Sequence, residues 1–108
     1  MDLIFEAVDP RGYRVVCTKD IWHNKILQKR PWMAGWEDEV QLAIEDPSLP
    51  ICKAASHDDR LIYYRRLNRI NARYIRVVVA AQSEEIGYII SAYPCDSGKS
   101  GEKAIWPE

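Results

Sequence analysis

The second half of the chain most strongly limits the possible folds. After Pro47 and Pro50 the chain contains four stretches rich in β-branched and aromatic residues, at 51–56, 61–67, 74–81 and 88–94. Turn-forming residues separate these stretches at 57–59, 68–71 and 83–87. Because a parallel crossover needs about a dozen residues or more, such short connections predict antiparallel neighbours.

Two helices are predicted before these strands. Thr18 is a suitable N-cap and Asp20 a suitable first-turn acid for a helix that continues through Gln28 and is ended by Pro31. A second helix is expected from Trp32 to Asp46, because apolar residues recur there at intervals of three to four positions. These apolar residues are Met33, Trp36, Val40 and Ile44.

The N-terminal segment predicts a β-hairpin. Residues 3–8 and 13–17 have strand composition, and the turn-forming sequence Asp9-Pro10-Arg11-Gly12 separates them. The expected fold is therefore α+β, with two helices on one face of a four- to five-stranded antiparallel sheet and an N-terminal hairpin. A chain of 108 residues can bury one core, so residues 1–108 are expected to form a single domain. Residues 96–101 are expected to form a flexible loop.

Composition excludes several classes of protein. Hydrophobic residues make up 47% and charged residues 29% of the chain, which is typical of an ordinary globular protein. The formal net charge of -1 excludes a protein that coats nucleic acid through a large positive field. Basic residues are nevertheless concentrated between Lys53 and Arg76, whereas acidic residues are concentrated between Glu37 and Asp46. A local basic patch is compatible with this segregation.

Neither a metal site nor a membrane segment is predicted. Cys17, Cys52 and Cys95 are widely spaced, form no CxxC pair, and are expected to be reduced. With His23 and His57 as the two histidines, the chain has no HExxH motif, and no cofactor is predicted. No stretch approaches the roughly 20 apolar residues that span a bilayer, and the start does not resemble a secretory leader. We expect a cytoplasmic protein.

The first candidate cluster lies on the first predicted helix. At about 100° per residue, His23 and Arg30 share nearly the same side, whereas Lys25 lies roughly 160° from His23. His23 and Lys25 are therefore alternative candidates for an acid, a base or a phosphate-binding residue. The competing interpretation of these residues is an ordinary solvated helix face.

Two predicted strands carry further candidates. Tyr63-Tyr64-Arg65-Arg66 combines rings that can stack on bases with guanidinium groups that suit phosphate, and further arginines, including Arg60 and Arg76, are nearby in sequence. Arginines also occur on outer sheet faces for structural reasons. Ser91 and Tyr93 share a strand face because side chains alternate. The pair becomes chemically relevant only with a basic partner opposite, since a buried serine is more often a satisfied polar group.

Seven short motifs, spread over about residues 15 to 106, resemble the phage-associated branch of the barnase/EndoU/colicin/RelE-like (BECR) nuclease superfamily. In chain order they are Trp22-x-x-Lys25-Ile26-Leu27, Arg30-Pro31-x-Met33, Val40-x-x-Ala43-Ile44-x-x-Pro47, Tyr63-Tyr64-Arg65, Val77-Val78-Val79, Ile90-Ser91-Ala92-Tyr93 and Lys103-Ala104-Ile105-Trp106. The resemblance implies two helices followed by a four-stranded antiparallel sheet. It also implies a metal-independent endoribonuclease that cleaves tRNA or mRNA by 2′-hydroxyl attack, as a toxin with an antitoxin or immunity protein as its partner.

The resemblance and the candidate clusters together assign the site residues. Four residues are predicted to be catalytic: His23, Lys25, Arg65 and Ser91. Five are predicted to bind RNA: Arg30, Tyr64, Arg66, Tyr93 and Lys103. Arg65 would bind the phosphate and Ser91 would donate a hydrogen bond to it, while Lys25 matches the family position and His23 better suits proton transfer near neutral pH.

The chain departs from the family pattern at two positions. Arg30-Pro31-Trp32 stands where relatives carry His-Pro-Glu, so both an imidazole and a carboxylate are missing. Ser91 replaces a threonine and keeps the hydroxyl. The first departure motivates an alternative hypothesis, in which the same fold is a non-catalytic RNA-binding or protein-interaction module.

Overall fold

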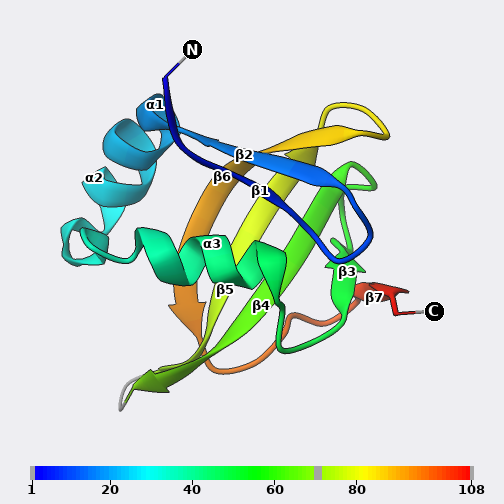
Figure 1. Cartoon of the computed structure of the whole chain (residues 1–108). Helices are drawn as coiled ribbons and strands as arrows, with labels where there is room; N and C mark the ends of the chain where they lie inside the picture. The colour runs from blue at the N-terminus through cyan, green and yellow to red at the C-terminus, as the bar shows by residue number, and fades with distance from the viewer. Residues whose placement is uncertain (1, 70–71, 108) are drawn as a thin grey trace.

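Within residues 2–69 and 72–107, which the computed structural model describes, seven strands form one sheet in the order β1-β2-β6-β5-β4-β3-β7 (Figure 1). The strands are β1 (Leu3–Val8), β2 (Arg14–Thr18), β3 (Ile51–Lys53), β4 (Arg60–Arg69), β5 (Ala72–Ala81), β6 (Ile86–Cys95) and β7 (Lys103–Trp106). The N-terminal hairpin and the antiparallel order of β3 to β6 confirm the sequence-based prediction.

The prediction of a four- to five-stranded, wholly antiparallel sheet was wrong in two respects. First, β2 pairs in parallel with β6, with Val15 opposite Gly87 and Val16 opposite Tyr88. The long chain between these strands satisfies the connection length that parallel pairing requires. Second, residues 103–106, expected to follow a flexible loop, form β7 and pair antiparallel with β3.

The first helical segment runs from Lys19 to Lys29, as α1 (Lys19–Ile21), a π-helical turn η1 (Trp22–Ile26) and α2 (Leu27–Lys29). Thr18 caps it as predicted, because its Oγ1 accepts a hydrogen bond of 3.2 Å from the backbone N–H of Ile21. Trp22 and Ile26 are buried and hold the segment against the core.

The second helix, α3 (Glu37–Glu45), begins later than predicted. A short 3-10 turn, η2 (Pro31–Met33), precedes it. Gly35 then adopts a φ of +93°, which interrupts a continuous helix at that point. Val40, Ala43 and Ile44 are buried, as the predicted apolar spacing requires.

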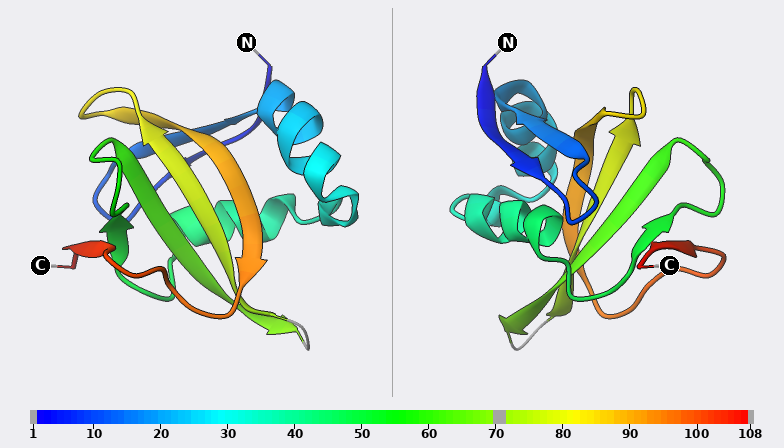
Figure 2. Two further views of the ribbon diagram at one scale, coloured as in Figure 1. Left: turned by 180° about the vertical axis from the view of Figure 1, so that it is seen from behind. Right: turned by 45° about the vertical axis from the view of Figure 1, so that its right-hand side comes forward.

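The helices cover one face of the sheet, and α3 packs against β1, β4 and β5 (Figure 1). The main core lies in this layer and includes Trp22, Met33, Ile44, Tyr63 and Val77. Seen from behind in Figure 2, β4, β5 and β6 are not covered by any helix. The second view in Figure 2 shows β3, β7 and the segment that leads into β7 on the other side of β4 from α3. We call this side of β4, β5 and β6 the open face.

No helix in the two described ranges is long and apolar enough to cross a bilayer.

Candidate functional site

The centre of the open face is a row of three polar side chains from neighbouring strands. Tyr64 of β4 is opposite Arg76 of β5, and Arg76 is opposite Tyr93 of β6. Because side chains alternate along a strand, the residues next to these three point the other way, and Tyr63, Val77 and Ala92 belong to the main core. The alternation therefore separates an apolar row under the helices from a polar row on the open face.

Arg76 is buried, with 6% of its surface exposed. Its Nε donates a hydrogen bond of 3.1 Å to the hydroxyl of Tyr64, and its Nη1 donates one of 2.5 Å to the hydroxyl of Tyr93. Its Nη2 forms a 2.6 Å ion pair with Oε2 of Glu102, which immediately precedes β7. A buried guanidinium requires such compensation, and Arg76 has a partner for each donor group.

Glu102 receives hydrogen bonds from three donors. In addition to Arg76, the Tyr64 hydroxyl donates to Oε1 at 2.5 Å, and the backbone N–H of Lys99 donates to it at 3.3 Å. Burial by itself would raise the pKa of Glu102, but the hydrogen bonds from Tyr64 and Arg76 and the charge of Arg76 outweigh it and lower that pKa. Burial and the hydrogen bond to Glu102 raise the pKa of Tyr64 to about 12. The network therefore holds an ionised carboxylate beside a neutral phenol.

A cavity of about 240 Å³ lies beside this network. Its lining includes Arg76 and Glu102, together with side chains from the segments before β4 and after β6. Four other lining residues have polar side chains that could bind or react with a ligand: Ser56, His57, Arg60 and Lys99. With Arg76 these residues supply three cations against the one carboxylate of Glu102, so the lining is cationic.

His57 gives the cavity an imidazole, a side chain that can act as a general base or acid. The Oγ of Ser56 lies 2.9 Å from Nδ1 of the His57 imidazole. That contact involves one ring nitrogen and leaves Nε2 for another partner. Arg60 forms an exposed ion pair of 3.0 Å with Asp59, which is a weak interaction in water.

Basic side chains also surround the ring of Tyr93. The guanidinium of Arg30 lies 5.0 Å from the ring centroid, that of Arg76 lies 5.5 Å away and the Lys99 ammonium lies 5.8 Å away. Arg30 and Tyr93, both predicted to bind RNA, are therefore brought together by the fold. Tyr64, the third predicted residue of this region, is in the same hydrogen-bonded network. Tyr64 is only 2% exposed and Tyr63 is fully buried, so neither ring is available to stack on a base as the sequence analysis expected.

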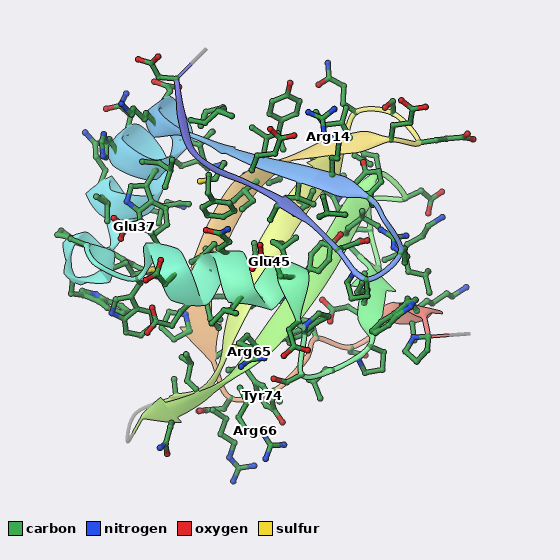
Figure 3. The ribbon with its side chains drawn as sticks, viewed as in Figure 1. Arg14, Glu37, Glu45, Arg65, Arg66 and Tyr74 are labelled. Carbon is green, nitrogen blue, oxygen red and sulfur yellow. The ribbon has the colours of Figure 1, made fainter. Side chains whose placement is uncertain are left out.

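A second basic-aromatic pair lies further along β4 and β5. The guanidinium of Arg66 lies 5.9 Å from the centroid of the Tyr74 ring, and Figure 3 shows both side chains at the same end of the sheet. The Tyr74 ring packs edge-to-face against Tyr64 at a centroid distance of 6.2 Å. Arg66, which was predicted to bind RNA, therefore lies next to the central row.

The four predicted catalytic residues do not come together. Arg65 is on the helix side of β4, where its Nη1 donates to the carbonyl of Asp46 at 2.7 Å and to Oδ2 of that residue at 2.8 Å. Ser91, opposite Val78, is on the same face as Tyr93. Arg65 and Ser91 therefore lie on opposite faces of the sheet and cannot contact one phosphate together. Their positions follow from strand alternation, which places neighbouring residues on opposite sides.

The remaining predicted residues lie outside the cavity. His23 and Lys25 are exposed on the 19–29 segment, and neither lines the cavity beside Arg76. Lys103 is exposed on β7, opposite Lys53 of β3.

The sequence-based site assignment left out the residues that line the cavity: His57, Arg60, Arg76, Lys99 and Glu102. Of these, Arg60 and Arg76 were noted only as basic residues near the Tyr63–Arg66 cluster. Arg76 had a recognisable signal, because it interrupts the apolar stretch from Ile75 to Ala81 and aligns with Tyr64 once the hairpin register is known. Glu102 and Lys99 had none, because the path of the chain across the open face brings them to Arg76.

A second buried carboxylate lies on the other side of β4. Asp9, whose side chain is fully buried, accepts a 2.8 Å hydrogen bond from the hydroxyl of Tyr63 and forms a 2.9 Å ion pair with Arg11. Its Oδ1 accepts the backbone N–H groups of Arg11 at 2.8 Å and Tyr13 at 3.0 Å. This network joins the β1–β2 turn to the core.

Comparisons with protein-family models, with curated proteins and with solved structures find no significant match for this chain. The likeness to the BECR nucleases therefore stays a prediction. Among the side chains that the structure describes, no group of three or more His, Cys, Asp and Glu residues is placed to hold a metal ion.

Proposed function

We propose that the protein is a metal-independent endoribonuclease that binds an RNA phosphate in the cavity beside Arg76. The observation that carries the proposal is the composition of this cavity, where an imidazole and three cationic side chains converge. The chain as a whole has a net charge of -1, so this local excess of positive charge is not a general property of the surface. Such a lining suits an anionic ligand.

The geometry supports a division of roles. Cleavage without a metal needs a base for the 2′-hydroxyl, an acid for the leaving 5′-oxygen and cations that stabilise the charge on the phosphorane. His57 takes the 2′-hydroxyl proton on Nε2, and the 2′-oxygen then attacks the phosphorus. Arg60 stabilises the charge that grows on the phosphate oxygens.

The leaving group also needs a proton. As the bond from phosphorus to the 5′-oxygen breaks, the Lys99 ammonium donates a proton to that oxygen. The products are a 2′,3′-cyclic phosphate and a 5′-hydroxyl. Exchange with water returns His57 and Lys99 to their starting protonation states. Arg76 and Glu102 are positioning residues in this scheme, because their hydrogen bonds fix the hydroxyls of Tyr64 and Tyr93 on the open face.

The cation–π contact between Arg30 and Tyr93 supports single-stranded RNA as the substrate. Unpaired bases can stack on a tyrosine ring or on a guanidinium plane, and both are present at this position. Arg66 and Tyr74 extend the same basic-aromatic surface along β4 and β5. Arg65, His23 and Lys25 are not part of the proposed catalytic group, because they lie away from the cavity.

The test measures cleavage of tRNA and mRNA in excess EDTA, with detection of 2′,3′-cyclic phosphate ends. His57→Ala should lower the rate at least about 100-fold, since acid-base catalysis contributes on that order. His23→Ala is the matched control, because His23 is an exposed histidine outside the cavity, and this variant should keep wild-type activity. Intact RNA of every class after long incubation with the wild type contradicts the proposal, as does full activity of His57→Ala.

The assignment as a toxin with an antitoxin or immunity partner extends this proposal. Expression of the wild-type chain in a bacterial host should arrest growth, and expression of His57→Ala should not. Normal growth in both cases argues against a toxin.

Arg30 favours a second candidate function, a non-catalytic RNA-binding module. Arg30 occupies the position at which the resemblance calls for an imidazole, and its guanidinium makes a cation–π contact with Tyr93. Wild-type protein that binds RNA, quenches its tyrosine or tryptophan fluorescence and leaves the RNA intact would identify this second function.

A further inference from the structure

Three donors from three separate parts of the chain converge on the carboxylate of Glu102. They are Nη2 of Arg76 on β5, the hydroxyl of Tyr64 on β4 and the backbone N–H of Lys99 in the segment before β7. A guanidinium, a hydroxyl and a backbone N–H are also the donors that bind phosphate oxygens in proteins. We call these three donors the Arg76 cradle.

We propose that the Arg76 cradle is a phosphate-binding site for RNA and that the Glu102 carboxylate occupies it in the free protein. The inference rests on the proposed function, because it concerns the same cavity. It adds a second phosphate position and a mechanism that controls access to it. RNA binds fully when one of its phosphates replaces the carboxylate of Glu102.

The guanidinium of Arg76 keeps its place without Glu102, whereas the backbone N–H of Lys99 belongs to the same segment as Glu102. Nε and Nη1 of Arg76 bond to the hydroxyls of Tyr64 and Tyr93, and neither contact involves the carboxylate. The guanidinium therefore stays oriented on the sheet, and only the donors that point to Glu102 become free. A preorganised donor set of this kind binds an anion without a large cost of reorganisation.

The position of the cradle allows the exchange. Glu102 lines the same cavity as Arg60 and Lys99, so a phosphate that enters the cavity arrives next to the carboxylate that it replaces. When Glu102 withdraws, the surroundings of Arg76 lose their negative charge, which strengthens the attraction for RNA.

The segment that carries Glu102 lies at the edge of the sheet, and Ile105 and Trp106 of β7 pack against the core. It leads into β7, a strand at the edge of the sheet that pairs with the short strand β3 (Ile51–Lys53). Residues 96–101 are exposed. Local opening of short edge elements costs less free energy than opening of central strands, so β7 can separate while β4, β5 and β6 stay intact.

Glu102→Gln tests the proposal. The amide keeps the size of the side chain, but it has no negative charge to pair with Arg76. Its NH2 group also cannot accept a hydrogen bond from the donors of the cradle. The probe is a fluorescent 2′-O-methyl RNA hexamer, which cannot undergo 2′-hydroxyl attack, so binding is measured whether or not the protein cleaves RNA. Circular dichroism confirms that the variant is folded.

We expect Glu102→Gln to bind the hexamer about tenfold more tightly than the wild type, a typical strength for coupling between two groups. Glu84→Gln, which changes an exposed carboxylate in the β5–β6 turn, is the matched control and should bind like the wild type. Equal or weaker binding by folded Glu102→Gln overturns the proposal and makes Glu102 a fixed structural partner of Arg76.

A measurement on the unmodified chain covers the case in which Glu102→Gln does not fold. Binding of the hexamer should speed hydrogen exchange at the backbone amides of β7 (Lys103–Trp106), because Glu102 no longer holds that end of the strand. Unchanged or slower exchange in β7 overturns the proposal. If the protein does not cleave RNA but these binding results are obtained, it is a phosphate-binding protein and not a nuclease.

Discussion

Tyr63 and Tyr64 are neighbours on β4 and make the same kind of contact with very different consequences. The hydroxyl of Tyr63 donates to Asp9 at 2.8 Å, and that of Tyr64 donates to Glu102 at 2.5 Å. Strand alternation sends the first toward the helices and the second toward the open face. A buried tyrosine bound to a carboxylate therefore does not by itself identify a functional site.

The partners of the two carboxylates explain the difference. Asp9 takes most of its hydrogen bonds from Arg11 and Tyr13, within its own turn. It stabilises the hairpin and attaches it to Tyr63. Glu102 takes its partners from Arg76 and Tyr64, which are far away in the sequence, and it lines a cationic cavity. Long-range convergence next to a cavity distinguishes the second network as the candidate site.

Asp9→Ala should have the largest effect on stability. The change leaves the buried hydroxyl of Tyr63 without its acceptor and Arg11 without its charge partner, which should lower the free energy of unfolding by about 3 kcal/mol. Urea denaturation followed by circular dichroism measures it. Asp58→Ala, at an exposed position, is the control and should change the value by less than about 0.5 kcal/mol. A loss below about 1 kcal/mol for Asp9→Ala would show that the hairpin does not depend on this network.

The paired variants Tyr63→Phe and Tyr64→Phe compare the networks most directly. Each removes one hydrogen bond to a carboxylate and should cost about 2 kcal/mol of stability. We expect weaker binding of the 2′-O-methyl RNA hexamer with Tyr64→Phe and unchanged binding with Tyr63→Phe. Equal effects of the two variants on RNA affinity would remove the functional distinction between the two sides of β4.

The smallest expected effect is a difference in Tm between the wild type and Glu102→Gln at acid pH. Because the folded-state pKa of Glu102 is lowered, its contribution to stability is complete above the ordinary glutamate pKa of about 4.3 and is lost as pH falls through the lowered value. The Tm of the wild type should therefore decrease below about pH 4.5, and that of Glu102→Gln should decrease less steeply. Parallel Tm curves for the two proteins would mean that the Arg76 ion pair contributes little to acid stability.

Much of the fold could be predicted because its signals are local. Thr18 as an N-cap, Pro31 as a helix end and the turns between β3, β4, β5 and β6 all act over a few residues. Gly35 shows that apolar spacing alone does not locate the start of a helix. Met33 and Trp36 fit the spacing of the predicted helix, but the positive φ of Gly35 interrupts the helix between them. The placement of Ser91 and Tyr93 on one strand face was also predictable, because the alternation of side chains is a local property of the strand.

The candidate site was predictable only in part. The sequence-based prediction included Arg30, Tyr64 and Tyr93, and the fold brings these three residues to one place. It also chose Arg65, because an arginine next to two tyrosines suits phosphate, but the side of the sheet depends on which face the helices cover. In the structure Arg65 bonds to Asp46 at the end of α3.

The feature that constrained the fold from the outset, four strands joined by short turns, was decided by the sequence alone, because side-chain alternation and turn chemistry operate within each segment. Tertiary structure decided the parallel pairing of β2 with β6 and the path of residues 96–102 across the open face. It also decided that Arg76 and Glu102 meet. The physical reason is that a buried charge needs a partner, and the partner can come from any segment that the packed chain brings within reach.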